Sequence, residues 1–208
     1  ISKYAICIKD PQDIKYELEK SYFLSTSGRC GPVVLDIPMD IQKADVNVET
    51  LVGFDGSAFE LKYNFQEIEK KVINFFEDLM KSKRPAILAG GGLRVTNNIE
   101  RFNFILEKLK IPAFVTWNGI DVVTSDSDYY GGRVGTYGGP GRNFGIQNTD
   151  LLFAIGSRVS GRITGGNVSS FAREAKKYIT DIDPELLDQK FQQVPFDVNI
   201  HSDLNNFL

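Results

Sequence analysis

Two arginines four positions apart follow an apolar run, and their chemistry suits an anion. Arg158 and Arg162 stand among glycines and hydroxyl side chains in GSRVSGRITGG, residues 156–166, directly after NTDLLFAI. The apolar run predicts a buried strand, and the turn that follows a strand does not require guanidinium groups. Because arginine presents a planar fork of donors that fits phosphate groups, the segment predicts an anion site. The alternative is that both arginines are surface charges.

Similar signals follow the other apolar runs in the second half of the chain. They are Gly90, Gly91 and Gly92 after RPAILA, Thr116 after IPAFV, Ser157 beside Arg158, and Asp181 with Asp183 in ITDIDPE. In a parallel sheet the carboxyl ends of the strands share one edge, where ligands bind. Glycine lets backbone N–H groups approach a phosphate, and a carboxylate accepts hydrogen bonds from ribose hydroxyls. The set predicts a nucleotide diphosphate lying across this edge.

Each of these residues also has an ordinary structural interpretation. The three glycines do not complete a G-x-G-x-x-G fingerprint, so they could form only a tight strand-to-helix turn. Asp181 or Asp183 could cap the helix that Pro184 begins. His201, the only histidine, fits a solvated or core position better than a catalytic one, and Trp117 fits packing better than lining a ligand.

A glycine-rich loop adds a further signal. The segment GGRVGTYGGPGRN, residues 131–143, holds seven glycines and prolines within 13 residues. Ordering such a segment costs much conformational entropy, which indicates close approach of a ligand or a subunit. No catalytic triad, nucleophile elbow, phosphate-binding Walker loop or metal-ligand cluster accompanies it, so we predict neither a catalytic residue nor a metal ligand in this chain.

The pattern of elements predicts how these residues are positioned. From Phe65 onward, amphipathic helical segments alternate with four apolar strands, which is typical of a doubly wound parallel sheet of the α/β class; the stretch between IPAFVTW and DLLFAIG is expected to be a long loop. Before it, residues 10–28 predict a helix and GPVVLDIP a strand. Residues 46–64 show no sustained period and predict a linker between domains.

Composition excludes several classes of function. A net charge of −3 lacks the basic footprint of a nucleic-acid binder. No apolar run is long enough to span a membrane, and no signal-peptide pattern opens the chain. Two cysteines without ligand spacing indicate a cytoplasmic protein.

Longer motifs give the chain a family resemblance. FLSTSGRCGPVVLDIPMDIQ resembles the end of the pyrimidine-binding domain in thiamine-diphosphate-dependent enzymes of the acetolactate synthase type. RPAILAGGGLR, GTYGGPGRNFGIQNTDLLFAIGSRVSGRITGG and ITDIDPE resemble their central domain, which has a Rossmann-like topology. The resemblance covers essentially the whole chain in the same order. It implies that 1–45 is the C-terminal part of the pyrimidine-binding domain, that 65–208 is the central nucleotide-binding-like domain, and that the chain is a piece of a longer protein.

The resemblance also implies cofactor contacts. In acetolactate synthase-like proteins the central domain holds FAD, and the matching positions here are Arg29, Gly90, Gly91, Gly92, Thr116, Gly135, Thr136, Arg158, Asp181 and Ile182. Ser157 and Arg162 complete the candidate set, with Arg162 supporting the loop of Arg158.

Several positions depart from the family pattern. Val134 replaces a histidine, Ser160 and Gly161 replace two aspartates, and Met39 replaces a lysine. Relatives in the superfamily bind ADP in this domain or leave it empty. FAD, ADP and an empty domain therefore all remain open.

The family's activity implies chemistry outside this chain. Thiamine diphosphate and Mg²⁺ would bind in segments beyond Ile1 and Leu208, and the whole enzyme would decarboxylate a 2-oxo acid and form a carbon–carbon bond. The chain alone would be inactive, and the enzyme would be a homodimer or homotetramer. The alternatives are a nucleotide-free scaffold or oligomerisation domain and, less well supported, a stand-alone NAD-type oxidoreductase.

Overall fold

The computed structural model describes residues 1–59 and 61–208. The chain divides into two compact units, Ile1–Lys62 and Tyr63–Leu208, and each is described by itself. Among the described residues, no helix combines the length and apolar content that crossing a bilayer requires.

The first unit is a small parallel pair of strands with one long helix. Its elements are β1 (Tyr4–Cys7), η1 (Pro11–Asp13), α1 (Ile14–Thr26), β2 (Val33–Asp36), α2 (Met39–Lys43), η2 (Val48–Thr50) and η3 (Ser57–Phe59). β1 and β2 pair in parallel with Tyr4 opposite Val33. Within the segment predicted as a linker, Phe54 and Phe59 contact the Phe23 ring of α1, at centroid distances of 5.6 and 6.1 Å. These residues therefore pack within the first unit.

The second unit is built on a six-stranded sheet, all of whose strands lie among the described residues 63–208. Its elements are α3 (Phe65–Leu79), β3 (Pro85–Ala89), α4 (Gly92–Val95), α5 (Ile99–Leu109), β4 (Ala113–Val115), η4 (Trp117–Gly119), β5 (Tyr130–Arg133), α6 (Pro140–Gln147), β6 (Leu151–Ile155), α7 (Gly161–Thr164), η5 (Val168–Ser170), β7 (Lys176–Asp181), α8 (Pro184–Leu187), β8 (Val198–His201) and α9 (Leu204–Phe207). Every strand pairing is parallel. The order β5-β4-β3-β6-β7-β8 is that of the dinucleotide-binding Rossmann fold.

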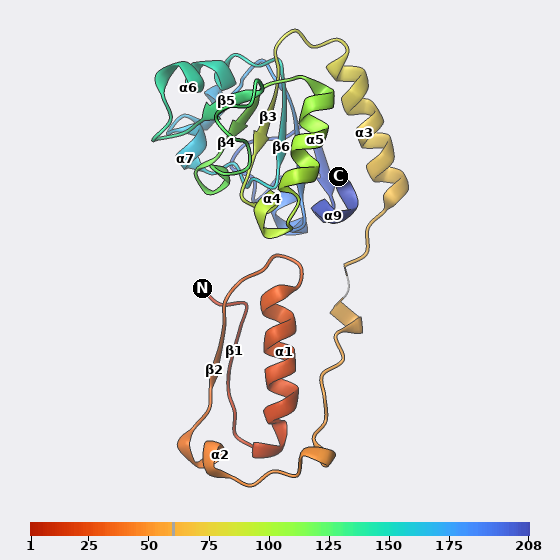
Figure 1. The fold of residues 1–208 in the computed structure, drawn as a ribbon, viewed down its shortest axis with the longest axis vertical. Helices are drawn as coiled ribbons and strands as arrows, with labels where there is room; N and C mark the ends of the chain where they lie inside the picture. The colour runs from red at the N-terminus through yellow and green to blue at the C-terminus, as the bar shows by residue number, and fades with distance from the viewer. Residues whose placement is uncertain (60) are drawn as a thin grey trace. The chain divides into compact units, whose positions relative to one another are not determined.

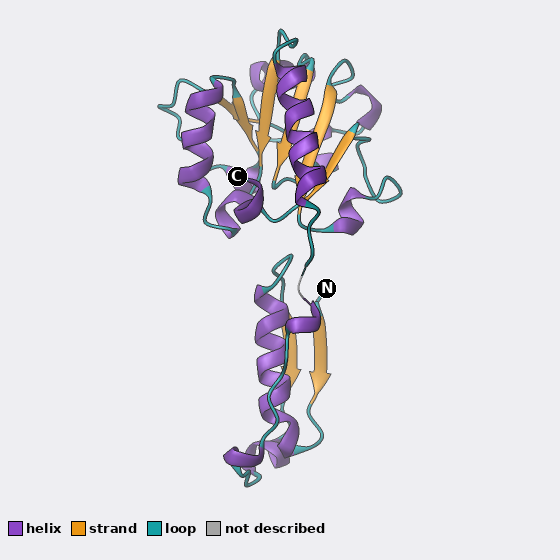
Figure 2. Cartoon of the chain, turned by 90° about the vertical axis from the view of Figure 1, so that its right-hand side faces the viewer, coloured by secondary structure: helices purple, strands orange, loops and turns teal. Residues whose placement is uncertain are grey.

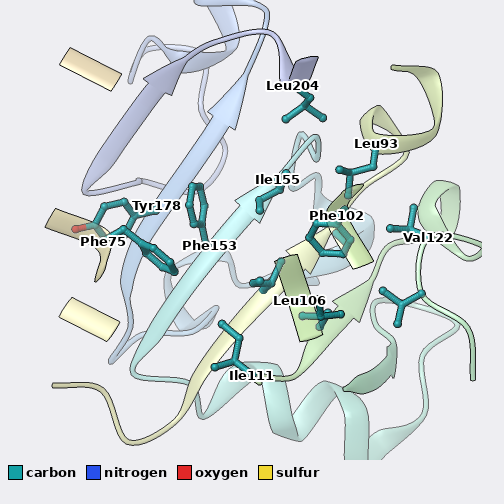
Figure 3. Close-up of a cluster of buried hydrophobic side chains, with 14 of the residues drawn as sticks. Phe75, Leu93, Phe102, Leu106, Ile111, Val122, Phe153, Ile155, Tyr178 and Leu204 are labelled. Atoms are coloured by element: carbon teal, nitrogen blue, oxygen red, sulfur yellow. The ribbon is translucent and has the colours of Figure 1, made fainter. Parts of the chain in front are cut away.

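Both faces of this sheet are covered, as Figures 1 and 2 show. Alternate residues of the central strands point to opposite faces: Phe153 of β6 joins one core and Leu152 the other. The first core packs against α3, α5 and α9 (Figure 3), and the second against α6 and α8. The predicted doubly wound α/β fold is confirmed.

The expected number of strands was too small. Four apolar strands and one long loop were predicted. The sheet has two more strands, β5, which lies inside that loop together with α6, and β8, which follows β7. β5 has the sequence YGGR, which carries little strand propensity. It pairs only with β4, through a register shift at Ala113/Phe114, so tertiary pairing determines this edge strand.

Two carboxylates fasten α3 and the turn after it to the sheet. The Tyr178 hydroxyl of β7 donates to Asp78 of α3, and the Lys176 ammonium lies 2.6 Å from the same carboxylate. Asp150, just before β6, accepts from the Ser82 hydroxyl and from the N–H groups of Lys83 and Arg84, at 2.9 and 3.0 Å. The helix therefore has fixed attachments as well as apolar packing.

Candidate functional site

The reversal of strand order places the candidate site between β3 and β6. These strands are neighbours, with Ala89 opposite Ile155, yet the chain continues to β4 on one side and to β7 on the other. The carboxyl edge at such a reversal is where open α/β sheets bind ligands. Gly90 follows β3 here, and Ser157 with Arg158 follows β6.

The glycines after β3 are accounted for by packing between two turns. A Cβ on Gly90 would overlap the Gly156 carbonyl oxygen. The N–H of Gly90 donates to Ile155 O at 2.9 Å, and the N–H of Gly92 donates to Gly156 O at 3.0 Å. Gly91 lies close to η4, where a Cβ would stand 2.8 Å from Asn118 O. The tight-turn interpretation therefore holds for this segment, and the N–H groups of Gly90 and Gly92 are already bonded within the chain.

Hydrogen bonds also join the loops after β5 and β6, although β4 and β3 lie between these strands in the sheet. Thr136 donates to the Arg162 carbonyl from its N–H at 2.9 Å and from its hydroxyl at 3.2 Å. Gly135 has φ +102°, and a Cβ there would stand 2.5 Å from the same carbonyl. The Asn143 side chain closes the loop by bonding both the N–H and the carbonyl of Gly135, at 2.9 and 3.0 Å. Arg162 therefore holds the loop after β5 through its backbone carbonyl, and its side chain is exposed. The support that it was predicted to give the loop of Arg158 stays a prediction.

Arg158 lines a cavity beside β7. The cavity has a volume of about 260 Å³, and its walls are Arg158, Ser160, Ile179, Leu186, Phe191, Gln192, Gln193, Val194 and Phe196. The Gln193 side chain accepts from the Gly161 N–H at 2.9 Å, which holds the 191–196 segment against the start of α7. Ser157 is buried, and its hydroxyl accepts from the Val159 N–H at 3.4 Å.

The side chain of Gln192 in the wall of this cavity carries a buried acceptor with no hydrogen-bond partner in the described part of the chain. Gln192 donates to Asn199 Oδ1 at 2.9 Å. Its own Oε1 is buried and has no hydrogen-bond partner among the described residues. Since buried polar atoms are nearly always paired, this oxygen is an exception beside the cavity.

Two acidic residues at and just after the end of β7, Asp181 and Asp183, make different contacts. Asp183 caps α8 by accepting from the Glu185 N–H at 3.1 Å, so the helix-cap interpretation holds for it. Asp181 is buried, and its side chain accepts from the Asp183 N–H at 3.0 Å. The Ile182 carbonyl lies 3.1 Å from His201 Nε2. His201 is half-buried and contacts the Tyr63 ring at 5.1 Å, which agrees with a structural histidine.

Trp117 does not lie in the core. Thr116 is buried and its N–H donates to Ala89 O at 3.0 Å, but the next side chain, Trp117, is 57% exposed. Its ring lies 5.2 Å from that of Tyr137, and the Arg133 guanidinium lies 5.0 Å from the indole centroid. Trp117 therefore packs against neighbouring side chains at the surface and not in the core.

Sequence reasoning missed several residues of this edge. Arg133 and Tyr137 belong to the glycine-rich segment 131–143, whose composition could have pointed to them. Phe191 and Gln192 lie in a segment whose sequence shows no motif that indicates a site. Arg29 is exposed in the first unit and stays a prediction. In the described parts of the chain, no group of three or more His, Cys, Asp or Glu side chains is placed to hold a metal ion.

Comparisons with known proteins agree with this topology. The family model for "Thiamine pyrophosphate enzyme, central domain" matches residues 72–208. The chain is 31% identical over 207 residues to the acetolactate synthase isozyme 2 large subunit of Escherichia coli (strain K12), covering 100% of this chain and 36% of that protein. It is 31% identical over 216 residues to a probable acetolactate synthase large subunit of Methanocaldococcus jannaschii, covering 100% of this chain and 35% of that one. The chain thus spans about a third of the length of these curated relatives.

Proposed function

The chain belongs to the thiamine pyrophosphate enzyme central-domain family, and from this premise we propose that it is the nucleotide-binding middle part of an acetolactate synthase-like enzyme. The nucleotide we propose is one with a diphosphate, FAD in the first place. No residue of this chain is given a catalytic role. Its work is to hold the nucleotide and to fix the loops at the carboxyl edge.

The observation that carries the proposal is the pairing of Arg158 with the cavity beside it. A guanidinium that lines the cavity fits a diphosphate. The apolar side chains of the walls, among them Ile179, Phe191 and Phe196, fit a flat ring. The unsatisfied Oε1 of Gln192 fits the exocyclic amine of an adenine. The residues present are therefore suited to an adenine nucleotide.

Three positions that depart from the family pattern, Val134, Ser160 and Gly161, offer a nucleotide fewer side-chain contacts than the family's residues would. Val134, where the synthases have histidine, is 4% exposed and packs in the second core, so its side chain is unavailable to a ligand. Ser160 lines the cavity, and Gly161 is bonded by Gln193. Nucleotide contacts on this side are thus expected from Arg158 and the cavity walls, not from a pair of carboxylates.

The reaction belongs to the longer protein that we propose. Thiamine diphosphate, held with Mg²⁺ by other segments, would supply the carbanion chemistry on a 2-oxo acid. This chain would position the nucleotide edge beside those segments within a homodimer or homotetramer. Because the chain spans about a third of its relatives, we expect it to bind nucleotide and not to turn over a 2-oxo acid by itself.

Calorimetric titration of the chain with FAD and ADP tests the proposal. Arg158→Ala is expected to weaken both affinities by about tenfold or more, since it removes a charge-assisted contact to phosphate. Arg173→Ala is the matched control, because Arg173 is an exposed arginine that precedes β7 and therefore lies at the opposite edge. Equal affinities in wild type and Arg158→Ala would refute the assigned role.

A nucleotide-free scaffold is the second candidate, and one observation favours it. The glycines of the edge are explained by internal packing and by bonds from Gly90 and Gly92 to the neighbouring turn. They do not need a phosphate to account for them. If neither FAD nor ADP binds in the titration above, the scaffold is the function that remains.

A further inference from the structure

The valine that follows Arg158 has a backbone conformation that valine rarely adopts. Val159 has φ +47°, in the left-handed region, where a side chain branched at Cβ is strongly disfavoured. Asn97, Lys110 and Ala172 are the other non-glycine residues with positive φ in the described part of the chain, and none of them is branched at Cβ. Strain of this kind persists only where the surrounding structure compensates for it, and it clusters at active sites and ligand-binding sites.

Burial of the valine side chain holds this conformation. Val159 is 1% exposed and belongs to the second core. Its N–H donates to Ser157 Oγ at 3.4 Å, and Ser157 is itself buried. Relaxing Val159 to an ordinary φ would therefore displace an apolar side chain from the core, which is unfavourable in water.

The strained residue lies between two residues that line the cavity. Arg158 and Ser160 both contribute to its wall, whereas Val159 is a member of the second core. The Arg158 side chain is exposed, although Ser157 and Val159 on either side of it are buried. An exposed arginine samples many rotamers and loses that freedom when it binds a ligand. A fixed backbone at Val159 restricts where its guanidinium can go.

The loop is also attached at both of its ends. The Gly156 N–H donates to Thr180 O of β7 at 3.4 Å, and the Ser160 carbonyl accepts from the Ile163 N–H of α7 at 2.8 Å. Between these two attachments, Val159 is the residue with a left-handed backbone. The direction in which Arg158 projects from the loop therefore depends on Val159.

We propose that Val159 is a positioning residue, whose strained and buried backbone directs the guanidinium of Arg158 toward the phosphate groups before a nucleotide binds. Core packing compensates for the strain in the free protein, so binding has to order less of the loop, which favours affinity. Val159 touches no ligand in this role and acts only through Arg158. This inference rests on the proposed nucleotide function.

A double-mutant cycle tests whether Val159 acts through Arg158. ADP would be titrated by calorimetry into the wild-type chain, Val159→Gly, Arg158→Ala and the double variant. Glycine adopts the left-handed conformation freely but has no side chain to anchor it in the core. Val159→Gly is expected to weaken ADP binding by about tenfold when Arg158 is present, and by less than about twofold in the Arg158→Ala background. A valine that only packs the core would give the same loss in both backgrounds.

Ala172→Gly is the matched control for the backbone. Ala172 has φ +42°, is buried and belongs to the same core, but it is not among the residues that line the cavity. Its ADP affinity should therefore stay within about twofold of wild type.

Val159→Thr is the conservative variant. Threonine keeps the shape and the branching of the side chain, so ADP affinity should be retained, although the buried hydroxyl lowers the midpoint of denaturation. If far-UV circular dichroism shows that Val159→Gly does not fold, Val159→Ala takes its place in the cycle with the same expectation.

The outcomes separate the inference from the function on which it rests. An equal loss of ADP affinity in both backgrounds, no loss in Val159→Gly, or a similar loss in Ala172→Gly would overturn the inference and leave the nucleotide function standing. Wild-type affinity in Arg158→Ala would refute the role of Arg158 and the inference with it. Failure of ADP to bind the wild-type chain would overturn the nucleotide function and the inference together.

Discussion

The glycines where the strand order reverses make packing contacts and hydrogen bonds within the chain. Gly90 and Gly156 meet so closely that the turns after β3 and β6 interlock. The same contact commits the Gly90 N–H to Ile155. A nucleotide at this edge would thus depend on Arg158 and the cavity for recognition, and on the glycines only for the close approach of the two turns.

Gly90→Ala should therefore destabilise the chain by about 3 kcal/mol, because the new methyl group would overlap the Gly156 carbonyl and neither backbone can move freely. Urea denaturation measures this. Gly141→Ala is the control, since a Cβ at Gly141 in α6 meets nothing within 4 Å; it should be neutral or stabilising by up to about 1 kcal/mol. Equal stability of Gly90→Ala and wild type would contradict the interlocked turns.

Elements are held to the sheet by a few buried or half-buried carboxylates. Burial alone would raise the pKa of Asp150, but hydrogen bonds from Ser82 and from the Lys83 and Arg84 N–H groups outweigh it and hold the pKa below its usual range. Burial would likewise raise the pKa of Asp78, but the hydrogen bonds from Lys176 and Tyr178 outweigh it and hold this pKa below its usual range. Both groups therefore favour the folded state when ionised.

The stability contributed by Asp150 should be pH-dependent in a defined direction. A carboxylate whose pKa is lowered on folding stabilises above its unfolded pKa of about 3.9, and this is lost as the pH falls through the folded value. Asp150→Ala should cost about 1 to 2 kcal/mol at neutral pH, and the difference from wild type should shrink at about pH 3. Denaturant unfolding at both pH values measures it; a difference that grows on acidification would exclude this explanation.

Element prediction succeeded where one strand or helix carried its own signal. β3, β4 and β6 read as apolar runs because parallel strands are buried on both faces, and α3 and α5 show their helical period directly. β5 could not be found in this way, since YGGR becomes a strand only by pairing with β4. Likewise Arg158 could be placed at a strand end from its spacing, whereas the exposure of Trp117 and the free oxygen of Gln192 depend on how loops fold over the edge.

At the scale of the whole molecule, the two units differ in how much core they possess. Of the buried hydrophobic residues among the described ones, only Ile8 precedes Tyr63. The second unit holds two cores, one on each face of its sheet. The prediction that residues 1–45 continue a pyrimidine-binding domain stays a prediction, but it agrees with a unit that buries little by itself.

The second unit should consequently fold alone and the first should not. Residues 63–208 expressed separately are expected to unfold cooperatively on heating, because both cores lie within them. Residues 1–62 carry a two-stranded sheet that buries too little apolar surface for independent stability. Far-UV circular dichroism with thermal melting compares them. A cooperative transition from residues 1–62 alone would show that this unit has stability of its own.

The location of Trp117 determines what an optical experiment on this protein will report. It is the only tryptophan in the sequence, and it stands exposed on a loop after β4 while the cores are lined by phenylalanine, tyrosine and aliphatic side chains. Intrinsic tryptophan emission will therefore follow the local environment of the carboxyl edge. A loss of that signal on heating would mark loosening of the edge loops, and melting of the sheet itself must be followed by a backbone signal.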